Sequence, residues 1–288
     1  MRHSCAMALL PYTLIEPSGA MSPLVVDSPH SGRIYPVDFA YTCPLHILRQ
    51  AEDAFVDEAV TGAANAGATI LMAEFPRSMI DVNRAENDID PNALDGVWPE
   101  PLNPDELTRA GFGLVRRMCR SGIAIYRTNL TVAEVLRRLD IYYRPYHQCL
   151  RSLVKARLKK FGACILLDVH SMPDRVENNS VREDFVLGDL DGASCDPALT
   201  RQAQKILRDM GYRVALNFPY KGREIVQRYG LTGHGANALQ VEINRKLYLD
   251  EIKIEKHKGM EKLREDMTAF FEAMMNFINA ANGKLAAE

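Results

Sequence analysis

Short apolar runs alternate with segments of helical periodicity along most of the chain, and this alternation restricts the fold more than any other feature. The runs with the length and composition of buried strands are 23–29, 68–75, 163–170, 184–190, 212–218 and 238–244. The segments in which apolar residues recur at three- and four-residue steps are 46–67, 131–162, 196–211 and 251–281. Strands that alternate with helices favour a largely parallel sheet covered on both faces. The sequence therefore predicts a three-layer α/β fold with a mostly parallel or mixed central sheet, in one domain that spans 1–288.

Charge and cysteine usage narrow the class of partner. The net charge is −2 and no arginine-rich arm or lysine run stands out, which argues against nucleic acid. The six cysteines stand singly, without CxxC or zinc-finger spacing, as is typical of a reduced cytoplasmic protein. The apolar stretch at the N-terminus is too short for a signal peptide, and no run approaches the length of a membrane helix. We expect a cytoplasmic protein whose partner is a small molecule, with neither nucleic acid nor membrane.

Two of the predicted strands deliver a histidine to their carboxyl ends, where open α/β sheets bind their ligands. His30 and His170 each follow an aspartate, Asp27 or Asp168, at a distance of two or three residues. Neutral imidazole is the commonest metal ligand, and a nearby carboxylate can fix its tautomer. Two histidines and one carboxylate form the ligand set of a hydrolytic zinc site. The pair therefore predicts a metal site, although either histidine alone is more often a satisfied core or loop residue.

The third ligand is less clearly marked. An HxxE spacing would place a glutamate at position 33, which is Arg33 here. Asp53 and Asp57 lie one turn apart on the predicted helix 46–67 and share a face of it. Asp53 opens an apolar stretch and is the first candidate, whereas Asp57 or Glu52 would equally serve as a surface charge.

Polar residues also follow the strand at 68–75, in a segment that presents Arg77, Asp81, Asn83 and Arg84 together. Arginine offers a planar fork that matches a carboxylate, and asparagine adds a neutral donor. The segment predicts a clamp for an anionic substrate. The alternative is an ordinary ion pair between Asp81 and Arg84 at the strand exit.

Glu242 stands among valine and isoleucine on a predicted buried strand. Because burial of a lone carboxylate is costly, it either pairs with a buried arginine or has a raised pKa suited to a general base. The sequence contains no GxSxG, P-loop, GxGxxG or HExxH motif, so serine hydrolase and nucleotide-binding mechanisms have no support. The segment 85–113 is rich in Pro, Asn, Asp and Gly and predicts a long irregular loop, either mobile or functional.

Six ordered motifs resemble the N-formylglutamate amidohydrolase family, and they span most of the chain. They read SPHSG, PRSMIDVNR, LLDVHSMP, FVLGD, NFPYKGREIVQRYG and ALQVEINRKLY. That family is similar to the zinc carboxypeptidases and to succinylglutamate desuccinylase, which implies a mixed sheet flanked by helices. The resemblance also implies a zinc ion, or another divalent metal, bound by His30, His170 and the helix acid Asp53.

The resemblance implies further roles around that metal. Glu242 matches the general base that activates the attacking water, and Asn83 with Arg84 matches the pair that holds the substrate carboxylate. Arg77 and Arg223 are additional candidates for binding substrate carboxylates. Lys221 stands where a second glycine is expected, which is a departure from the family pattern.

The sequence thus predicts a metal-dependent amidohydrolase that acts on a small N-acyl amino acid. The leading substrate is N-formyl-L-glutamate, with formate and L-glutamate as products. Two alternatives stay open: a carboxypeptidase- or desuccinylase-like hydrolase on another N-acyl amino acid or peptide, and a non-catalytic ligand-binding relative. The sequence does not identify the acyl group, the metal loaded in the cell or the oligomeric state. It also does not indicate whether the loop 85–113 is a lid.

Overall fold

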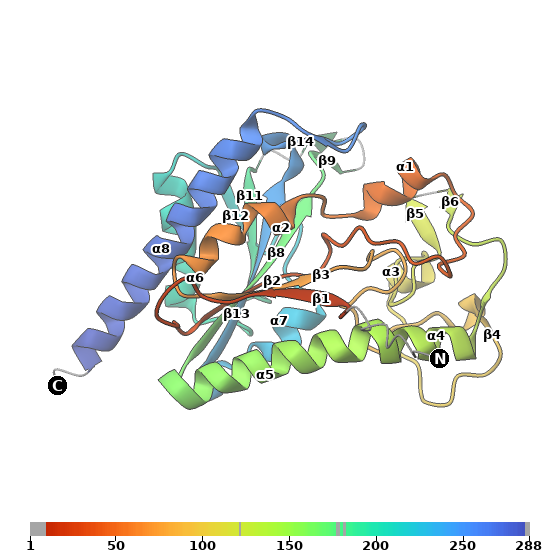
Figure 1. The fold of residues 1–288 in the computed structure, drawn as a ribbon, viewed down its shortest axis with the longest axis horizontal. Helices are drawn as coiled ribbons and strands as arrows, with labels where there is room; N and C mark the ends of the chain where they lie inside the picture. The colour runs from red at the N-terminus through yellow and green to blue at the C-terminus, as the bar shows by residue number, and fades with distance from the viewer. Residues whose placement is uncertain (1–9, 121, 177–178, 181–182, 286–288) are drawn as a thin grey trace, which may run out of the picture.

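The computed structural model describes residues 10–120, 122–176, 179–180 and 183–285, arranged around a seven-stranded sheet (Figure 1). The strand order across this sheet is β1-β3-β2-β8-β13-β11-β12. The strands are β1 Tyr12–Ile15, β2 Leu24–Ser28, β3 Thr69–Ala73, β8 Cys164–Met172, β11 Phe185–Gly188, β12 Val214–Leu216 and β13 Ala236–Asn244. All six predicted strands form, and β1 is an additional edge strand.

The sheet is mixed, as predicted. The pairs β2–β3, β2–β8 and β8–β13 are parallel, as is β11–β12. The pairs β1–β3 and β11–β13 are antiparallel. The long strands β8 and β13 are almost wholly buried, because helices cover both faces of the central sheet.

Each face of the sheet has its own hydrophobic core. One core packs α2 (Val56–Ala59), α6 (Pro197–Asp209) and α8 (Gly259–Leu285) on residues such as Val169 and Val241. The other packs α4 (Val132–Arg138), α5 (Arg144–Phe161) and α7 (Glu224–Tyr229) on residues such as Leu166 and Ala238. Figure 1 shows α8 and α5 on opposite sides of the strands. The predicted three-layer architecture is therefore confirmed.

The helix predicted at 46–67 is wrong as a single element. The segment forms α1 (Leu45–Leu48), a 3₁₀ turn at Arg49–Ala51, the short α2 and a second 3₁₀ turn at Thr61–Ala64. Between the turns the backbone leaves the helix: Asp53 donates its amide to the carbonyl of His30 (3.0 Å), and Phe55 has a φ of 64°. Asp53 and Asp57 consequently do not share a helix face. A non-local hydrogen bond overrides the helical periodicity here, and periodicity alone does not reveal it.

The C-terminal helix predicted from 251 begins later, at Gly259. Residues before it form an antiparallel hairpin of β14 (Leu249–Asp250) and β15 (Glu255–Lys256). In that hairpin Ile254 has a φ of 56°, which a helix cannot contain.

The helix predicted at 131–162 is confirmed in its ends and modified in its middle. Thr131 accepts a hydrogen bond from the amide of Glu134 (3.2 Å), and Gly162 ends the helix in the left-handed conformation. A π-helical turn, Leu139–Tyr143, separates α4 from α5 just before Pro145, which has no amide hydrogen to donate.

The segment 85–113 is mainly irregular, as predicted, but includes a 3₁₀ turn at Pro91–Ala93, β4 (Leu94–Asp95) and α3 (Glu106–Arg109). The remaining short strands are β5 (Met118–Arg120), β6 (Ile123–Ala124), β7 (Leu130–Thr131), β9 (Arg175–Val176) and β10 (Asn179–Ser180). Two further 3₁₀ turns lie at Thr232–His234 and Arg245–Leu247. Among the helices described, none has the length and apolar character needed to cross a membrane.

Candidate active site

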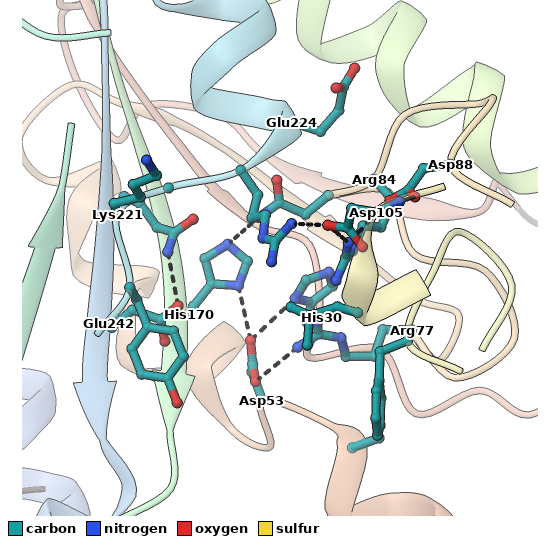
Figure 2. Close-up of a pocket in the computed structure, with 18 of the residues that line it drawn as sticks. His30, Asp53, Arg77, Arg84, Asp88, Asp105, His170, Lys221, Glu224 and Glu242 are labelled. Atoms are coloured by element: carbon teal, nitrogen blue, oxygen red, sulfur yellow. Dashed lines mark hydrogen bonds and ion pairs between the residues drawn. The ribbon is translucent and has the colours of Figure 1, made fainter. Parts of the chain in front are cut away.

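A cavity of about 870 Å³ opens beyond the carboxyl ends of β2, β3 and β8. Its walls come from the loops that follow these strands, from the irregular loop 85–113 and from the segment that leads into α7 (Figure 2). All eight residues to which the sequence assigns a metal-binding, catalytic or substrate-binding role line it: His30, Asp53, Arg77, Asn83, Arg84, His170, Arg223 and Glu242. The cavity therefore lies where the sequence predicts a ligand site, beyond the carboxyl ends of the strands.

Strand alternation explains why two of these residues, His170 and Glu242, lie close together. On β8, Leu167 and Val169 point to the core of α2, α6 and α8, so Asp168 and His170 point to the opposite face. The neighbouring β13 follows the same rule, because Val241 belongs to that first core and Glu242 faces the other way. In the parallel register, Glu242 stands opposite His170. A base candidate and a ligand candidate thus lie side by side.

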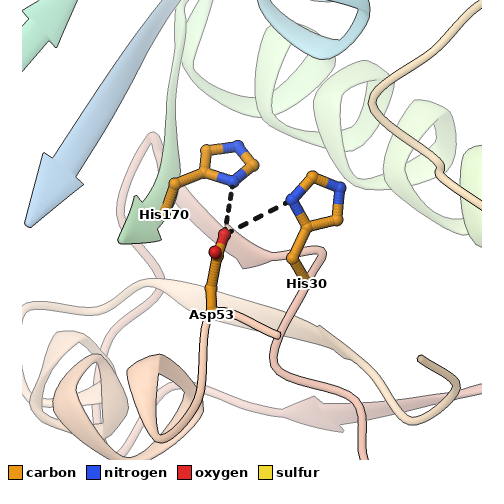
Figure 3. A group of neighbouring side chains, drawn as sticks. All are labelled: His30, Asp53 and His170. Carbon is orange, nitrogen blue, oxygen red and sulfur yellow. Dashed lines mark hydrogen bonds and ion pairs between the residues drawn. The ribbon is translucent and has the colours of Figure 1, made fainter. Parts of the chain in front are cut away.

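His30, Asp53 and His170 converge on one point (Figure 3). The Nδ1 atom of His30 lies 3.3 Å from Oδ2 of Asp53, and Nδ1 of His170 lies 3.0 Å from the same oxygen. The centroids of the two imidazole rings are 4.7 Å apart. Within the described part of the chain this is the one trio of His, Cys, Asp or Glu whose ligand atoms lie within 4.8 Å of one another.

A carboxylate stands behind each histidine. Oδ1 of Asp81 lies 2.7 Å from Nε2 of His30, and Oδ1 of Asp168 lies 2.8 Å from Nε2 of His170. Both aspartates are fully buried. For His30 this partner holds the ring proton on Nε2 and leaves the Nδ1 lone pair for a metal, whereas Oδ1 of Asp168 makes no hydrogen bond within the described chain. Both Nδ1 atoms point at the Asp53 carboxylate, so the ring orientations suit a shared cation.

The donor set fits a divalent metal. Nδ1 of His30 is buried and has no hydrogen-bond partner among the described residues, although it faces Asp53. Two imidazole nitrogens and one carboxylate are a ligand set of catalytic zinc sites. Nδ1 of His170 instead forms a hydrogen bond with Oδ2 of Asp53 (3.0 Å), and a cation bound between the three groups would replace the proton of that hydrogen bond.

Asp53 is held in place from behind. Nη2 of Arg245 donates to its Oδ1 (3.1 Å), which leaves Oδ2 toward the histidines. Burial acts to raise the pKa of Asp53, but the hydrogen bond with His170, the neighbouring His30 ring and the charge of Arg77 hold it well below its usual range. Asp53 is therefore an anion in the folded protein. Burial acts to lower the pKa of His170, whereas the adjacent Asp168 raises it well above the usual value.

The two other acids considered for the ligand position lie elsewhere. Asp57 forms an ion pair with Arg33 (3.3 Å) at the protein surface. Glu52 is buried but accepts hydrogen bonds from Tyr35 (2.6 Å) and Arg49 (3.2 Å). Of the three acids, only Asp53 joins the histidine pair.

Glu242 is buried beside the trio and forms no ion pair with any described arginine or lysine. Its Oε1 accepts a hydrogen bond from Nε2 of Gln240 (3.0 Å). Burial raises the pKa of Glu242 to about 7, and the charge of His170 opposes that rise. Of the two interpretations of this residue, the structure favours an acid with a raised pKa over one that pairs with a buried arginine.

The arginines of the cavity have different partners. Arg77 donates to Oδ2 of Asp81 through Nη2 (2.9 Å) and Nε (3.2 Å). Arg84 donates instead to Asp88 and Asp105, at 3.0 Å each. The alternative of an ion pair between Asp81 and Arg84 is therefore wrong, because Arg77 rather than Arg84 pairs with Asp81.

Asp105 connects the irregular loop to both walls of the cavity. Its Oδ2 accepts hydrogen bonds from Nη1 of Arg84 (3.0 Å) and Nη1 of Arg223 (2.6 Å). Figure 2 shows Asp105 and Arg84 close together. The other oxygen, Oδ1, caps α3 by accepting from the amide of Thr108 (2.7 Å). Burial acts to raise the pKa of Asp105, but the Thr108 amide and the two arginines hold it well below its usual value.

Asn83 lines the cavity while its side-chain amide is engaged. Its Oδ1 accepts from the amide of Ile225 (2.9 Å), which ties the strand exit to α7. Its Nδ2 lies 3.1 Å from Nε2 of His170 and donates to Oδ2 of Asp168 (3.4 Å). Lys221, the departure from the family pattern, lines the cavity and faces Asp191 at 3.7 Å.

Sequence reasoning missed several polar residues that line this cavity, among them Asp105, Arg116, Gln240 and Arg245. For Arg245 and Gln240 the signal was present, since both stand in the ALQVEINRKLY motif beside Glu242. Strand alternation places Gln240 on the face of Glu242. Arg116 follows an irregular loop and carries no periodic or motif signal.

The family model for N-formylglutamate amidohydrolase matches residues 22–249. The chain belongs to this family. The predicted family and the predicted class, a hydrolase, are confirmed.

Individual relatives give the same result. N-formylglutamate deformylase from Pseudomonas putida is 28% identical over 253 residues, which are 80% of this chain and 82% of that protein. The protein of the same name from Pseudomonas aeruginosa is 31% identical over 237 residues, 80% of this chain and 83% of the relative. A crystal structure of N-formylglutamate amidohydrolase from Ralstonia eutropha JMP134 has a TM-score of 0.91 at 41% identity and covers 95% of this chain and 100% of that chain.

Proposed function

We propose that this protein is a metal-dependent amidohydrolase that cleaves the formyl amide of N-formyl-L-glutamate to formate and L-glutamate. The observation that carries the proposal is the convergence of His30, Asp53 and His170 beside the buried acid Glu242. Membership of the N-formylglutamate amidohydrolase family and similarity to two N-formylglutamate deformylases support the substrate.

The metal would be bound by Nδ1 of His30, Nδ1 of His170 and the carboxylate of Asp53. Zinc is the leading candidate, because two imidazoles and one carboxylate form a ligand set of catalytic zinc; another divalent metal is an alternative. When bound, such a cation polarises a carbonyl and makes water a stronger acid. Asp81 and Asp168 keep the two rings oriented toward it.

Glu242 would move the proton that the reaction requires. Hydrolysis of an amide removes a proton from the attacking water and delivers one to the nitrogen of the leaving amine. A carboxyl with a pKa of about 7 exchanges protons in both directions near neutral pH.

The arginines would bind the two carboxylates of the substrate. Arginine matches a carboxylate through two parallel hydrogen bonds, so Arg77, Arg84 and Arg223 are suited to an acidic amino acid. Asn83 adds an amide donor next to His170. Asp105 already places a carboxylate oxygen between Arg84 and Arg223. A substrate carboxylate bound there would replace that oxygen and free the irregular loop from the cavity wall.

The test is formate release by purified protein whose metal content has been measured. Wild type loaded with one equivalent of zinc should release formate from N-formyl-L-glutamate, and chelation should abolish the release. A panel of N-succinyl and N-acetyl amino acids and short peptides separates the proposed reaction from that of a desuccinylase or carboxypeptidase. Zinc-loaded protein that is inactive on N-formyl-L-glutamate would reject the substrate. Metal content that is unchanged in a His30→Ala/His170→Ala variant would favour the non-catalytic alternative.

A further inference from the structure

Arg116 lies in the cavity wall on a segment that the surrounding backbone fixes in place. The amide of Asp81 donates to the carbonyl of Leu114 (2.8 Å), and the amide of Leu114 donates to the carbonyl of Asp88 (2.9 Å). A Cβ at Gly113 would lie 2.7 Å from the carbonyl oxygen of Asp88, so only glycine allows this close approach. These contacts hold the Arg116 segment against the strand exit that carries Asp81.

The Arg116 guanidinium is largely buried, and no described residue accepts a hydrogen bond from it. The side chain is 12% exposed, and Nη2 is 3.6 Å from Oδ2 of Asp81, too far for a hydrogen bond. Its Nε atom is fully buried, and no acceptor reaches it within the described chain. Asp81 is already engaged, since it accepts hydrogen bonds from Arg77 and from the amide of Asn83 and lies against His30.

The other arginines of the cavity are better compensated. Arg84 donates to two aspartates and Arg223 to one, while Arg77 and Arg245 each donate to an aspartate of the metal region. Arg116 is the exception among the arginines that line the cavity. A buried guanidinium with unused donors is costly, and it leaves a positive charge available to an anionic ligand.

We propose that Arg116 binds one carboxylate of the substrate directly and is a specificity-determining residue for acidic N-acyl amino acids. This inference rests on the proposed function and names a contact that the sequence did not indicate. A carboxylate placed against Arg116 would accept from the donors that Asp81 does not reach. Arg84 and Arg223 bind the second carboxylate only if it displaces Asp105, whereas a carboxylate binds Arg116 without such a displacement.

The electrostatics of the cavity agree with this role. Burial lowers the pKa of Arg116 to about 9, and the nearby charge of Arg77 adds to the effect. Both causes destabilise the cation. The negative charge of an anion bound beside it would offset both, so binding energy is available specifically to a ligand with a carboxylate in this place.

The experiment compares Arg116→Gln with the matched control Arg117→Gln, each as the metal-loaded protein. Arg117 is the next residue and carries the same charge, but it is 42% exposed, faces Asp90 and does not line this cavity. The substrates are N-formyl-L-glutamate, N-formyl-L-glutamine and the α-amide of N-formyl-L-glutamate. The last two each replace one carboxylate by a neutral amide.

Arg116→Gln should lose about 30-fold or more in kcat/KM on N-formyl-L-glutamate, because a buried charge-assisted contact is removed. The loss should persist on one amide analogue and nearly vanish on the other, which identifies the carboxylate that Arg116 binds. Arg117→Gln should resemble wild type on all three substrates. Equal losses on all three substrates in Arg116→Gln would overturn the inference, as would no loss on any.

A binding measurement separates this inference from the proposed function. Titration calorimetry with glutarate, a dicarboxylate without an amide, should show binding to wild type and at least tenfold weaker binding to Arg116→Gln. Wild type that binds glutarate through Arg116 but releases no formate would retain the inference and reject the substrate. Wild type that binds no glutarate would overturn the inference. If Arg116→Gln does not fold, Arg116→Lys keeps the charge, and it should lose affinity because the planar fork is absent.

Discussion

Asp81→Asn should weaken metal binding and the fold together, although Asp81 is not itself a proposed ligand. Asp81 is fully buried, and its Oδ1 lies 2.7 Å from Nε2 of His30. Its Oδ2 accepts two hydrogen bonds from Arg77. Asparagine keeps the shape of the side chain but removes the charge that fixes the His30 ring and neutralises Arg77.

The magnitudes follow from these contacts. Loss of the carboxylate behind a metal-binding histidine typically weakens metal affinity about 10- to 100-fold. Removal of one partner from a buried ion pair costs about 3–5 kcal/mol, and we expect about 3 kcal/mol because asparagine can still accept one hydrogen bond. Although burial acts to raise the pKa of Asp81, Arg77 and His30 hold it well below the usual value. Stability from such a group is present above its unfolded pKa of about 4 and is lost as the pH falls through the lower folded pKa.

Two assays measure the two effects. Competition with a chromophoric chelator gives the zinc affinity, and urea unfolding of the metal-free protein at pH 7 gives the free energy of unfolding. Asp57→Asn is the matched control, because Asp57 pairs with Arg33 at the surface and should change stability by about 1 kcal/mol or less. The difference in stability between wild type and Asp81→Asn should shrink in acid. Asp81→Asn protein that binds zinc as tightly as wild type would refute the role assigned to the carboxylate behind His30.

Three further changes test the remaining parts of the site. Glu242→Gln should lower kcat about 10²- to 10⁴-fold with unchanged zinc content, measured by formate release and metal analysis; activity near wild type would exclude Glu242 as the base. In wild type, kcat/KM should fall in acid at or below pH 7, because Glu242 must be deprotonated to act as the base. Its pKa is about 7, and a bound cation would lower that pKa. A pH profile of kcat/KM that is flat down to pH 5 would contradict this prediction. Asp105→Asn keeps an oxygen to cap α3 but removes the negative charge between Arg84 and Arg223. Because the substrate carboxylate then no longer competes with that charge, KM for N-formyl-L-glutamate should fall. A rise in KM would mean that Asp105 orders the arginines for the substrate instead.

Much of the fold could be predicted because its central strands are buried on both faces. The apolar runs that became β8 and β13 carry their polar residues at alternate positions near the carboxyl end, so Asp168, His170 and Glu242 were marked by pattern alone. The sheet then brings them together through a parallel register that needs no further information. The site therefore follows from the sequence wherever a regular strand delivers the side chain.

The rest depends on irregular backbone. Asp53 reaches the histidines because its amide bonds the carbonyl of His30 and because Phe55 takes a left-handed conformation, both set by tertiary contacts. Periodicity over the same residues indicated an unbroken helix. Arg116 and Asp105 lie in or just after the irregular loop, where no repeating pattern indicates which side chain faces the cavity.

Anomalous diffraction at the zinc absorption edge, from crystals of zinc-loaded protein, tests the central claim most directly. The expected result is one strong peak about 2 Å from Nδ1 of His30, Nδ1 of His170 and a carboxylate oxygen of Asp53. A peak at any other position in active protein would contradict the proposed metal site.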